Sequence, residues 1–203
     1  MKRLTINIED IYIKGGPVQL TEVITSIDNS LQKLSQATED ATILVNKYSS
    51  SNKGQQYRKM ASALEALSNR LYEASVDINS MQNEIVNYQN KVMRYEGMAE
   101  SAVLPNKITI ERAHVEVDIA DVKFELNEMN EIKNGLNIYS ATIFYGMQDI
   151  VRKKNDIGQI WLDTQYKTFA EFIDELNMDT LASVKTFGEY LEYLEERIKA
   201  ISN

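Results

Sequence analysis

The sequence predicts an all-α protein in which two long antiparallel helical hairpins form an elongated four-helix bundle. Apolar residues recur at alternating steps of three and four over most of the 203 residues, which is the periodicity of one helix face. Proline occurs only twice and glycine eight times, so long stretches lack the residues that break helices. A short pattern also returns later in the chain, which predicts two similar units.

The returning pattern is glycine, glutamine, any residue and an aromatic residue. It occurs as Gly54-Gln55-Gln56-Tyr57 and as Gly158-Gln159-Ile160-Trp161, an offset of 158 − 54 = 104 residues. Leu4-Thr5-Ile6 and Ile108-Thr109-Ile110 stand at the same offset. Two agreements in one register favour an internal duplication, with residues 1–103 as the first helical hairpin unit and residues 104–203 as the second.

The first helix is expected to begin at Pro17, which follows two glycines and can occupy a first helical position. The apolar residues at 4–13, ahead of it, predict a short strand or an extended arm. The polar segment Ser49–Gly54 predicts a hairpin turn at the other end of the helix. The apolar seam between these points consists of Leu20, Ile24, Ile27, Leu31, Leu34, Thr38, Ala41, Val45 and Tyr48.

The strongest periodic signal follows this turn and predicts a helix on the order of 60 Å long, at about 1.5 Å per residue. A helix of this length needs a partner along its apolar face, and the preceding helix supplies it. The segment 102–107, which contains Pro105, is the expected linker between the units. The seam consists of Tyr57, Met60, Leu64, Leu67, Leu71, Ala74, Ile78, Met81, Ile85, Tyr88, Val92, Tyr95 and Ala99.

The second unit is expected to repeat this plan, with its turn at Asn155–Gly158 and its hairpin tip at the opposite end of the bundle from the first tip. Its first seam consists of Val115, Ile119, Val122, Leu126, Met129, Ile132, Leu136, Tyr139, Ile143 and Ile150. Two consecutive steps of three around Met129 predict local overwinding. The returning seam consists of Phe169, Phe172, Leu176, Leu181, Val184, Phe187, Leu191, Leu194, Ile198 and Ile201. Asn177-Met178-Asp179 is expected to bend or restart that helix.

Composition argues against several classes of function. The formal net charge is −8, whereas nucleic-acid binding needs a surplus of Lys and Arg. Lys+Arg against Asp+Glu gives 11 − 12 = −1 for residues 1–103 and 11 − 18 = −7 for residues 104–203, so the acidity belongs to the second unit. The sequence contains no run of about 18 apolar residues, so no membrane span is predicted. Asn7, Glu9 and Asp10 interrupt the region where a cleavable signal peptide would need its apolar core.

No combination of residues predicts a catalytic, metal or cofactor site. His114 is the sole histidine, and with Glu111 it has the Glu-x-x-His spacing of carboxylate-bridged metal centres. Such a centre needs two of these motifs, so a surface histidine is the favoured interpretation. There is no cysteine, and Gly15-Gly16-Pro17 lacks the residues of a phosphate-binding loop. We therefore expect no enzyme activity and no cofactor.

The candidate recognition residues lie at the two expected turns and are Gly54, Tyr57, Gly158, Trp161, Asp163 and Phe169. An aromatic residue at the start of a returning helix can pack onto the last turn of the preceding helix and close the hairpin. Tyr57 and Trp161 are interpreted first as core residues that cap the hairpins. The alternative is that Trp161 contacts a partner.

Two helices joined by a short turn with a tryptophan, in a unit of about one hundred residues, resemble the WxG-motif family of helical hairpins handled by bacterial type VII secretion systems. Trp161-Leu162-Asp163 stands where that family has Trp-x-Gly, and Phe169 stands where it often has Phe. Tyr57-Arg58-Lys59 takes the place of the motif in the first unit. Asp163 and Lys59 replace the glycine of the motif, so the turns differ in detail.

The resemblance implies a non-enzymatic binding protein, secreted without a cleavable signal peptide or co-secreted by a type VII-like system. Its partner would be the secretion machinery or a co-secreted toxin. The export pattern Tyr-x-x-x-Asp/Glu matches only at Tyr145 and Asp149, inside the expected third helix, so a partner is expected to carry that signal. Family members commonly pair as antiparallel dimers of hairpins, which implies a monomeric pseudo-dimer or a homodimer.

Two other readings of function stay open. The first is a cytoplasmic helical adaptor or chaperone that binds a partner helix along a long apolar seam. The second is an α-helical pore-forming toxin, for which the helices are long enough but no hairpin is apolar enough to enter a bilayer.

Overall fold

The computed structural model describes residues 4–5, 17–49, 54–98, 110–115, 125–162 and 164–202. These residues contain four helices and no strand, which confirms the predicted all-α class. The helices are α1 (Pro17–Lys47), α2 (Gln55–Tyr95), α3 (Leu126–Ile157) and α4 (Thr164–Ser202). The predicted boundary between the units, at residues 103 and 104, lies outside the described part.

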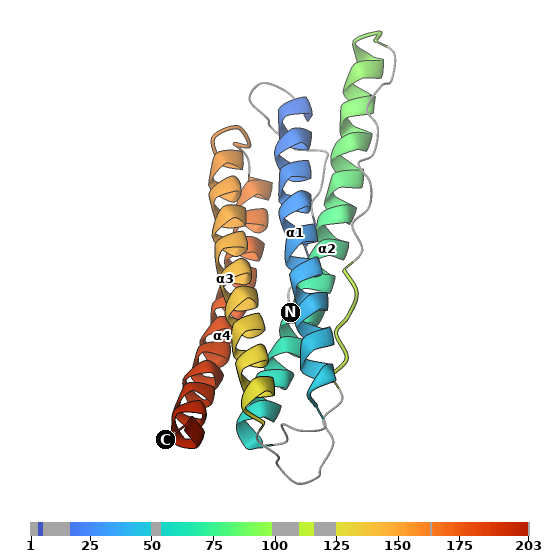
Figure 1. Cartoon of the computed structure of the whole chain (residues 1–203). Helices are drawn as coiled ribbons and strands as arrows, with labels where there is room; N and C mark the ends of the chain where they lie inside the picture. Colours follow the sequence, from blue (N-terminus) through green and yellow to red (C-terminus); the bar gives the residue numbers. More distant parts are fainter. Residues whose placement is uncertain are drawn as a thin grey trace.

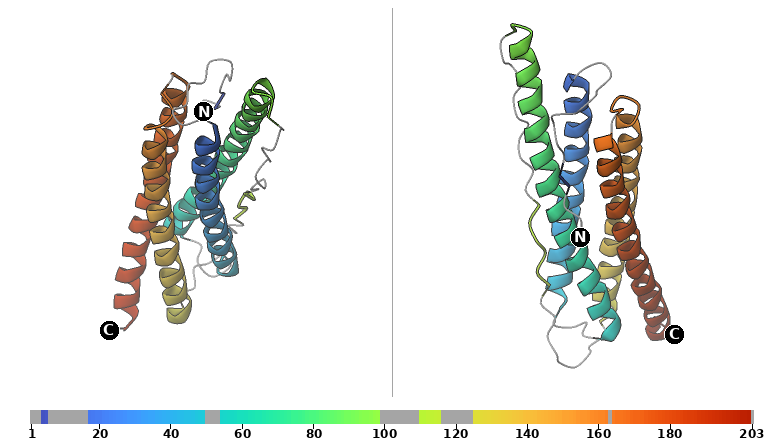
Figure 2. Two further views of the ribbon diagram at one scale, coloured as in Figure 1. Left: turned by 90° about the horizontal axis from the view of Figure 1, so that it is seen from above. Right: turned by 180° about the vertical axis from the view of Figure 1, so that it is seen from behind.

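The four helices form an elongated bundle in which every neighbouring pair is antiparallel (Figure 1). α1 packs against α2 and α3, and α4 packs against α3 and α2. The turn between α1 and α2 lies at one end of the bundle, and the turn between α3 and α4 lies at the other (Figures 1 and 2). The predicted arrangement, with hairpin tips at opposite ends, is therefore confirmed.

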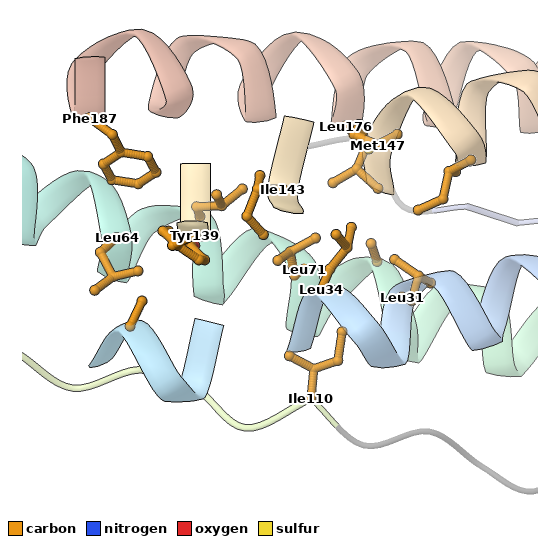
Figure 3. Close-up of a cluster of buried hydrophobic side chains, with 14 of the residues drawn as sticks. Leu31, Leu34, Leu64, Leu71, Ile110, Tyr139, Ile143, Met147, Leu176 and Phe187 are labelled. Atoms are coloured by element: carbon orange, nitrogen blue, oxygen red, sulfur yellow. The ribbon is translucent and has the colours of Figure 1, made fainter. Parts of the chain in front are cut away.

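The core is continuous along the bundle because all four helices turn their apolar seams inward (Figure 3). In the first hairpin, the predicted seam is buried from Ile24 to Tyr48 and from Tyr57 to Ile85. The side chains of Leu20 and Val92, and all of Ala99, lie outside the described part. Core side chains from every helix meet in the close-up, and they include Leu31, Leu34, Leu64, Leu71, Tyr139, Ile143, Met147, Leu176 and Phe187.

The prediction that the α2 seam continues to Tyr95 is wrong, because this side chain is 93% exposed. The reason is length: α2 has 41 residues, whereas α1 has 31. The last turns of α2 extend past the ends of the other helices (Figure 1). Its terminal residues therefore have no neighbouring helix to pack against among the described residues.

The start of the third helix also differs from the prediction. Val115 was expected in the helix, but residues 110–115 are not helical and α3 begins at Leu126, which is exposed. Ser68 of α2 holds the segment, because its Oγ donates to the Glu111 carbonyl (3.2 Å) and accepts from the Ala113 amide (2.5 Å). These bonds satisfy main-chain groups that a helix would otherwise satisfy internally. The predicted Ile119 and Val122 lie outside the described part.

The buried positions of α3 do not include two consecutive steps of three around Met129, because Leu126 is exposed, and Met147 fills the step between Ile143 and Ile150. The predicted local overwinding stays a prediction. In α4, the helix does not restart at Asn177-Met178-Asp179, because it is continuous from Thr164 to Ser202. The buried seam of α3 consists of Met129, Ile132, Leu136, Tyr139, Ile143, Met147, Ile150, Lys154 and Ile157.

At two positions of the α4 seam, the residue just before the predicted one is buried. Tyr190 is buried, whereas the predicted Leu191 is only partly buried. Thr180 is buried in place of Leu181, which is exposed, and Ile201 near the end of the helix is also exposed. The Thr180 hydroxyl donates to the Leu176 carbonyl at 2.8 Å. This internal bond lets a polar side chain face the core without an unsatisfied group.

The described part of the expected N-terminal arm is Leu4-Thr5, which is neither helix nor strand. Leu4 is buried, and its amide donates to Asp77 Oδ2 of α2 at 3.1 Å. The rest of the arm and the linker 102–107 lie outside the described part. None of the described helices has a stretch apolar and long enough to cross a bilayer.

Candidate functional site at the two hairpin turns

The first turn is closed by Tyr57, which lies in the first turn of α2 and is buried. Its hydroxyl donates to the Val45 carbonyl near the end of α1 at 2.5 Å, as expected for an aromatic cap on the preceding helix. Its ring meets the Tyr190 ring of α4 edge-on at 6.0 Å. Burial raises the pKa of Tyr57, so the phenol stays neutral. Tyr57 therefore joins three helices.

Gly54 precedes α2 at a bend, and its carbonyl accepts the Arg58 amide at 3.1 Å. A Cβ placed at this position would lie 4.0 Å from Tyr193 Oη, which is an ordinary van der Waals distance. The space around Gly54 therefore does not require a glycine.

The second turn encloses Trp161, which lies between α3 and α4 and not in the returning helix. Trp161 is 1% exposed, and its amide donates to the Ile157 carbonyl at 2.8 Å. Its ring stacks on Phe169 of α4, with centroids 5.9 Å apart. Within the described part of the chain, the buried indole Nε1 has no hydrogen-bond partner. Trp161 thus sits in the core of the turn, as the capping interpretation requires.

The residues after Trp161 differ in exposure. Leu162 is 54% exposed, so it is the apolar side chain that this turn presents to solvent. Asp163, the residue in the place of the motif's glycine, lies outside the described residues.

Gly158 ends α3 with φ −63° and ψ −14°, so its conformation is open to any residue. The expected turn at Asn155–Gly158 is corrected accordingly, because α3 continues through Ile157. A Cβ at position 158 would lie 2.5 Å from Tyr166 Oη. A side chain at position 158 would therefore require the Tyr166 ring to move, because that ring lies across the end of α3.

Tyr166 is the site residue that sequence reasoning missed. Its hydroxyl donates to the Lys154 carbonyl at 3.1 Å, twelve residues earlier in the chain, as Tyr57 donates to Val45. The two pairs are related by one offset, since 166 − 57 = 109 and 154 − 45 = 109. The helix starts agree, because 126 − 17 = 109 and 164 − 55 = 109. Each tyrosine is the third residue of its returning helix.

The recurring Gly-Gln-x-aromatic pattern therefore occupies two different places. In the first hairpin it begins the returning helix, whereas in the second it ends α3 and crosses the turn. The counterpart of Tyr57 in position and bonding is Tyr166, and Trp161 is an additional core residue. The signal that could have identified Tyr166 is an aromatic two positions after a helix start, which requires the helix boundaries.

Lys154, near the second turn, and His114, beside the first hairpin, each lie next to a carboxylate. Lys154 is buried, and its Nζ lies 2.5 Å from Asp174 Oδ1 of α4. His114 is exposed, with Nδ1 3.4 Å from Glu65 Oε1. Among the residues that the structure describes, no group of three or more His, Cys, Asp or Glu side chains could hold a metal ion.

The fold and the turns define a class, an antiparallel four-helix bundle of two hairpins with an aromatic residue closing each turn. Comparisons with known protein families, with curated proteins and with solved structures found no match.

Proposed function

We propose that this chain is a non-enzymatic helical binding protein resembling tandem WxG-type proteins, secreted or co-secreted by a bacterial type VII-like system. The observation that carries the proposal is the matched pair of tyrosine closures, Tyr57 on Val45 and Tyr166 on Lys154. They support two equivalent hairpins in one chain, in a register of 109 residues. A dimer of hairpins fused into one polypeptide would have this arrangement.

An ion pair between α2 and α4 also supports the equivalence of the hairpins. Arg70 Nε lies 2.7 Å from Asp179 Oδ2, and 179 − 70 = 109, so the pair joins corresponding positions. Corresponding positions contact each other where a two-fold axis passes between them. The opposite charges of Arg70 and Asp179 would favour pairing of the two hairpins over pairing of either hairpin with itself.

The proposed partner is the secretion machinery or a co-secreted toxin. Because the Trp161 indole is buried and Leu162 is exposed, a partner that binds the second turn would contact Leu162. The export pattern supports a partner-borne signal, because Tyr145 and Asp149 lie in the middle of α3. Asp149 is already bonded to Lys153 Nζ at 2.7 Å.

The test is export from the native host. Deleting the ATPase of the type VII-like system is expected to remove most of the protein from the culture medium while the cellular amount persists. A protein exported through a signal peptide serves as the control for lysis and general secretion. Equal extracellular amounts with and without the ATPase would contradict the proposal. A protein found only in the cytosol of both strains would favour the adaptor alternative.

A second experiment tests the turn. Leu162→Asp changes an exposed side chain, so it is expected to leave thermal melting unchanged while it lowers export or recovery of the partner. Leu181→Asp, on the exposed side of α4, is the matched control. Equal export of the two variants would exclude the second turn as the recognition site.

A further inference from the structure

The outer face of α1 and α3 contains a groove of about 430 Å³ with an apolar lining. Small residues form much of its floor, and they leave the space that makes the groove. Gly135 lies against Leu44, and a side chain at position 135 would overlap that leucine. The lining residues include Ala37, Ala41, Leu44, Gly135, Ile138 and Tyr139.

The same face presents a protruding apolar ridge on α3 and two charges on α1. Ile138, at the edge of the groove, is 70% exposed, and Tyr145, two turns further along α3, is also 70% exposed. Lys33 and Asp40 line the α1 side. Neither Lys33 nor Asp40 forms an ion pair in the described part of the chain. Opposite charges seven residues apart lie on the same side of a helix.

The groove occupies only one half of this face. Beyond Tyr145, the space between α1 and α3 is closed by a polar network. Lys153 Nζ lies 2.7 Å from Asp149 Oδ2 and 2.7 Å from Ser30 Oγ, and Asp149 also accepts a hydrogen bond from Ser30. The hydrogen bond to Lys153 lowers the pKa of Asp149. One half of the face is therefore open and apolar, and the other half is filled.

The register of the two helices shows where these features lie relative to one another. Leu34 packs against Gly146, and Thr38 Oγ1 lies 3.3 Å from Tyr139 Oη. Gln36 of α1 is therefore level with the region of Thr142 in α3. Measured from this level, Lys33 and Asp40 lie about equally far on either side along α1. Tyr145 and Ile138 lie about equally far on either side along α3.

We propose that this face binds a second copy of the chain across a two-fold axis at the level of Gln36 and Thr142. In such an isologous contact, a residue at a given distance on one side of the axis lies opposite the residue at the same distance on the other side in the second copy. Lys33 of each copy then faces Asp40 of the other. Tyr145 of each copy enters the groove of the other, beside Ile138. A single axis satisfies the charge pairing and the apolar pairing together.

The apolar contact supplies the affinity, and the charges set the register. Exposed ion pairs contribute roughly 0 to 1 kcal/mol each, so two Lys33–Asp40 pairs alone would not hold the dimer. Like charges placed opposite each other act against the complex and select among registers. This proposal is independent of export and of any secretion partner.

The experiment is sedimentation equilibrium of the full chain over a concentration series up to about 100 µM, a range that detects micromolar affinity. A dimer mass is expected for the unchanged protein. Lys33→Asp places two like-charge contacts in each dimer, and the dissociation constant is expected to rise about tenfold or more. The double variant Lys33→Asp/Asp40→Lys exchanges the charges and is expected to restore dimerisation. Ile138→Asp is expected to leave only monomer.

Lys185→Asp makes the same charge change on the exposed surface of α4 and is the matched control, with dimerisation unchanged. All of the changed side chains are exposed, so thermal melting is expected to stay at the unchanged value. A monomer at every concentration would overturn the proposal. If the dissociation constant of the dimer is unchanged by Lys33→Asp and by Ile138→Asp, the interface lies elsewhere and the proposal is overturned. If the double variant dimerises as weakly as Lys33→Asp alone, the proposed pairing of Lys33 with Asp40 of the other copy is overturned.

Discussion

At the scale of single residues, the core of the first hairpin contains an acid in an unfavourable place. Asp28 of α1 is 3% exposed, and it accepts a hydrogen bond from the Gln82 amide of α2. Burial raises the pKa of Asp28 to about 6, although the bond from Gln82 opposes this shift. An ionised carboxylate in this position is poorly solvated, so Asp28 is a source of instability at neutral pH.

Asp28→Asn is expected to stabilise the protein at neutral pH. The folded-state pKa lies above the unfolded value of 3.8, so the contribution of Asp28 to stability is full below about pH 4 and declines as pH rises through about 6. The variant should exceed the unchanged protein by about 1 to 2 kcal/mol at pH 7.5 and match it near pH 3.5. Urea unfolding at the two pH values measures this difference. A variant less stable at pH 7.5 would show that the carboxylate is favourably bound.

The closing tyrosines permit a test of whether the two turns are equivalent. Tyr57→Phe and Tyr166→Phe each remove a hydroxyl that donates to a main-chain carbonyl, and each is expected to cost about 1 kcal/mol. The free energy of unfolding of each variant measures the loss. Tyr95→Phe, at a side chain that is 93% exposed, is the control. If only one of the two variants loses stability, the two tyrosine hydrogen bonds do not contribute equally to the free energy of unfolding, although their geometry is alike.

At the scale of helices, the seams of α1 and of the first part of α2 were predictable because each helix buries one face along its whole contact. The start of α3 was not, because the bonds from Ser68 that hold residues 110–115 outside a helix come from a distant part of the chain. Thr180 was missed because a polar residue is not expected in the apolar seam. Its hydroxyl bonds to a carbonyl of its own helix, so the side chain can be buried. Trp161 was predicted, but Tyr166 depended on helix boundaries that periodicity does not supply.

Ile78→Asp tests the seam of α2. Ile78 is fully buried, so an unpaired carboxylate there is expected to destabilise the fold by about 4 kcal/mol or more. Val76→Asp, two residues away on the exposed side of the same helix, is the matched control and should change stability by less than about 1 kcal/mol. Thermal melting followed by circular dichroism separates the two variants. Similar melting curves would mean that α2 does not bury the face containing Ile78.

At the scale of the whole molecule, two hairpins with tips at opposite ends explain the packing of every helix. Each hairpin alone would leave an apolar face exposed along its length, and antiparallel association buries both faces in one core (Figure 3). The predicted fold class and tip arrangement needed only periodicity and the positions of two turns. The outer groove between α1 and α3 depends on how closely Gly135 approaches Leu44, which periodicity does not reveal.

The most direct test of this architecture is the distance between spin labels at the hairpin tips, measured by double electron–electron resonance. The chain has no cysteine, so labels can be placed only where they are introduced, and Gln56, Gln159 and Ala200 are exposed. The Gln56→Cys/Gln159→Cys pair spans the bundle and is expected to give roughly 45 Å, from about 30 helical residues at 1.5 Å each. The Gln56→Cys/Ala200→Cys pair lies at one end and should be much shorter. A short distance for the first pair, with the two tips side by side, would contradict the antiparallel pairing of the hairpins.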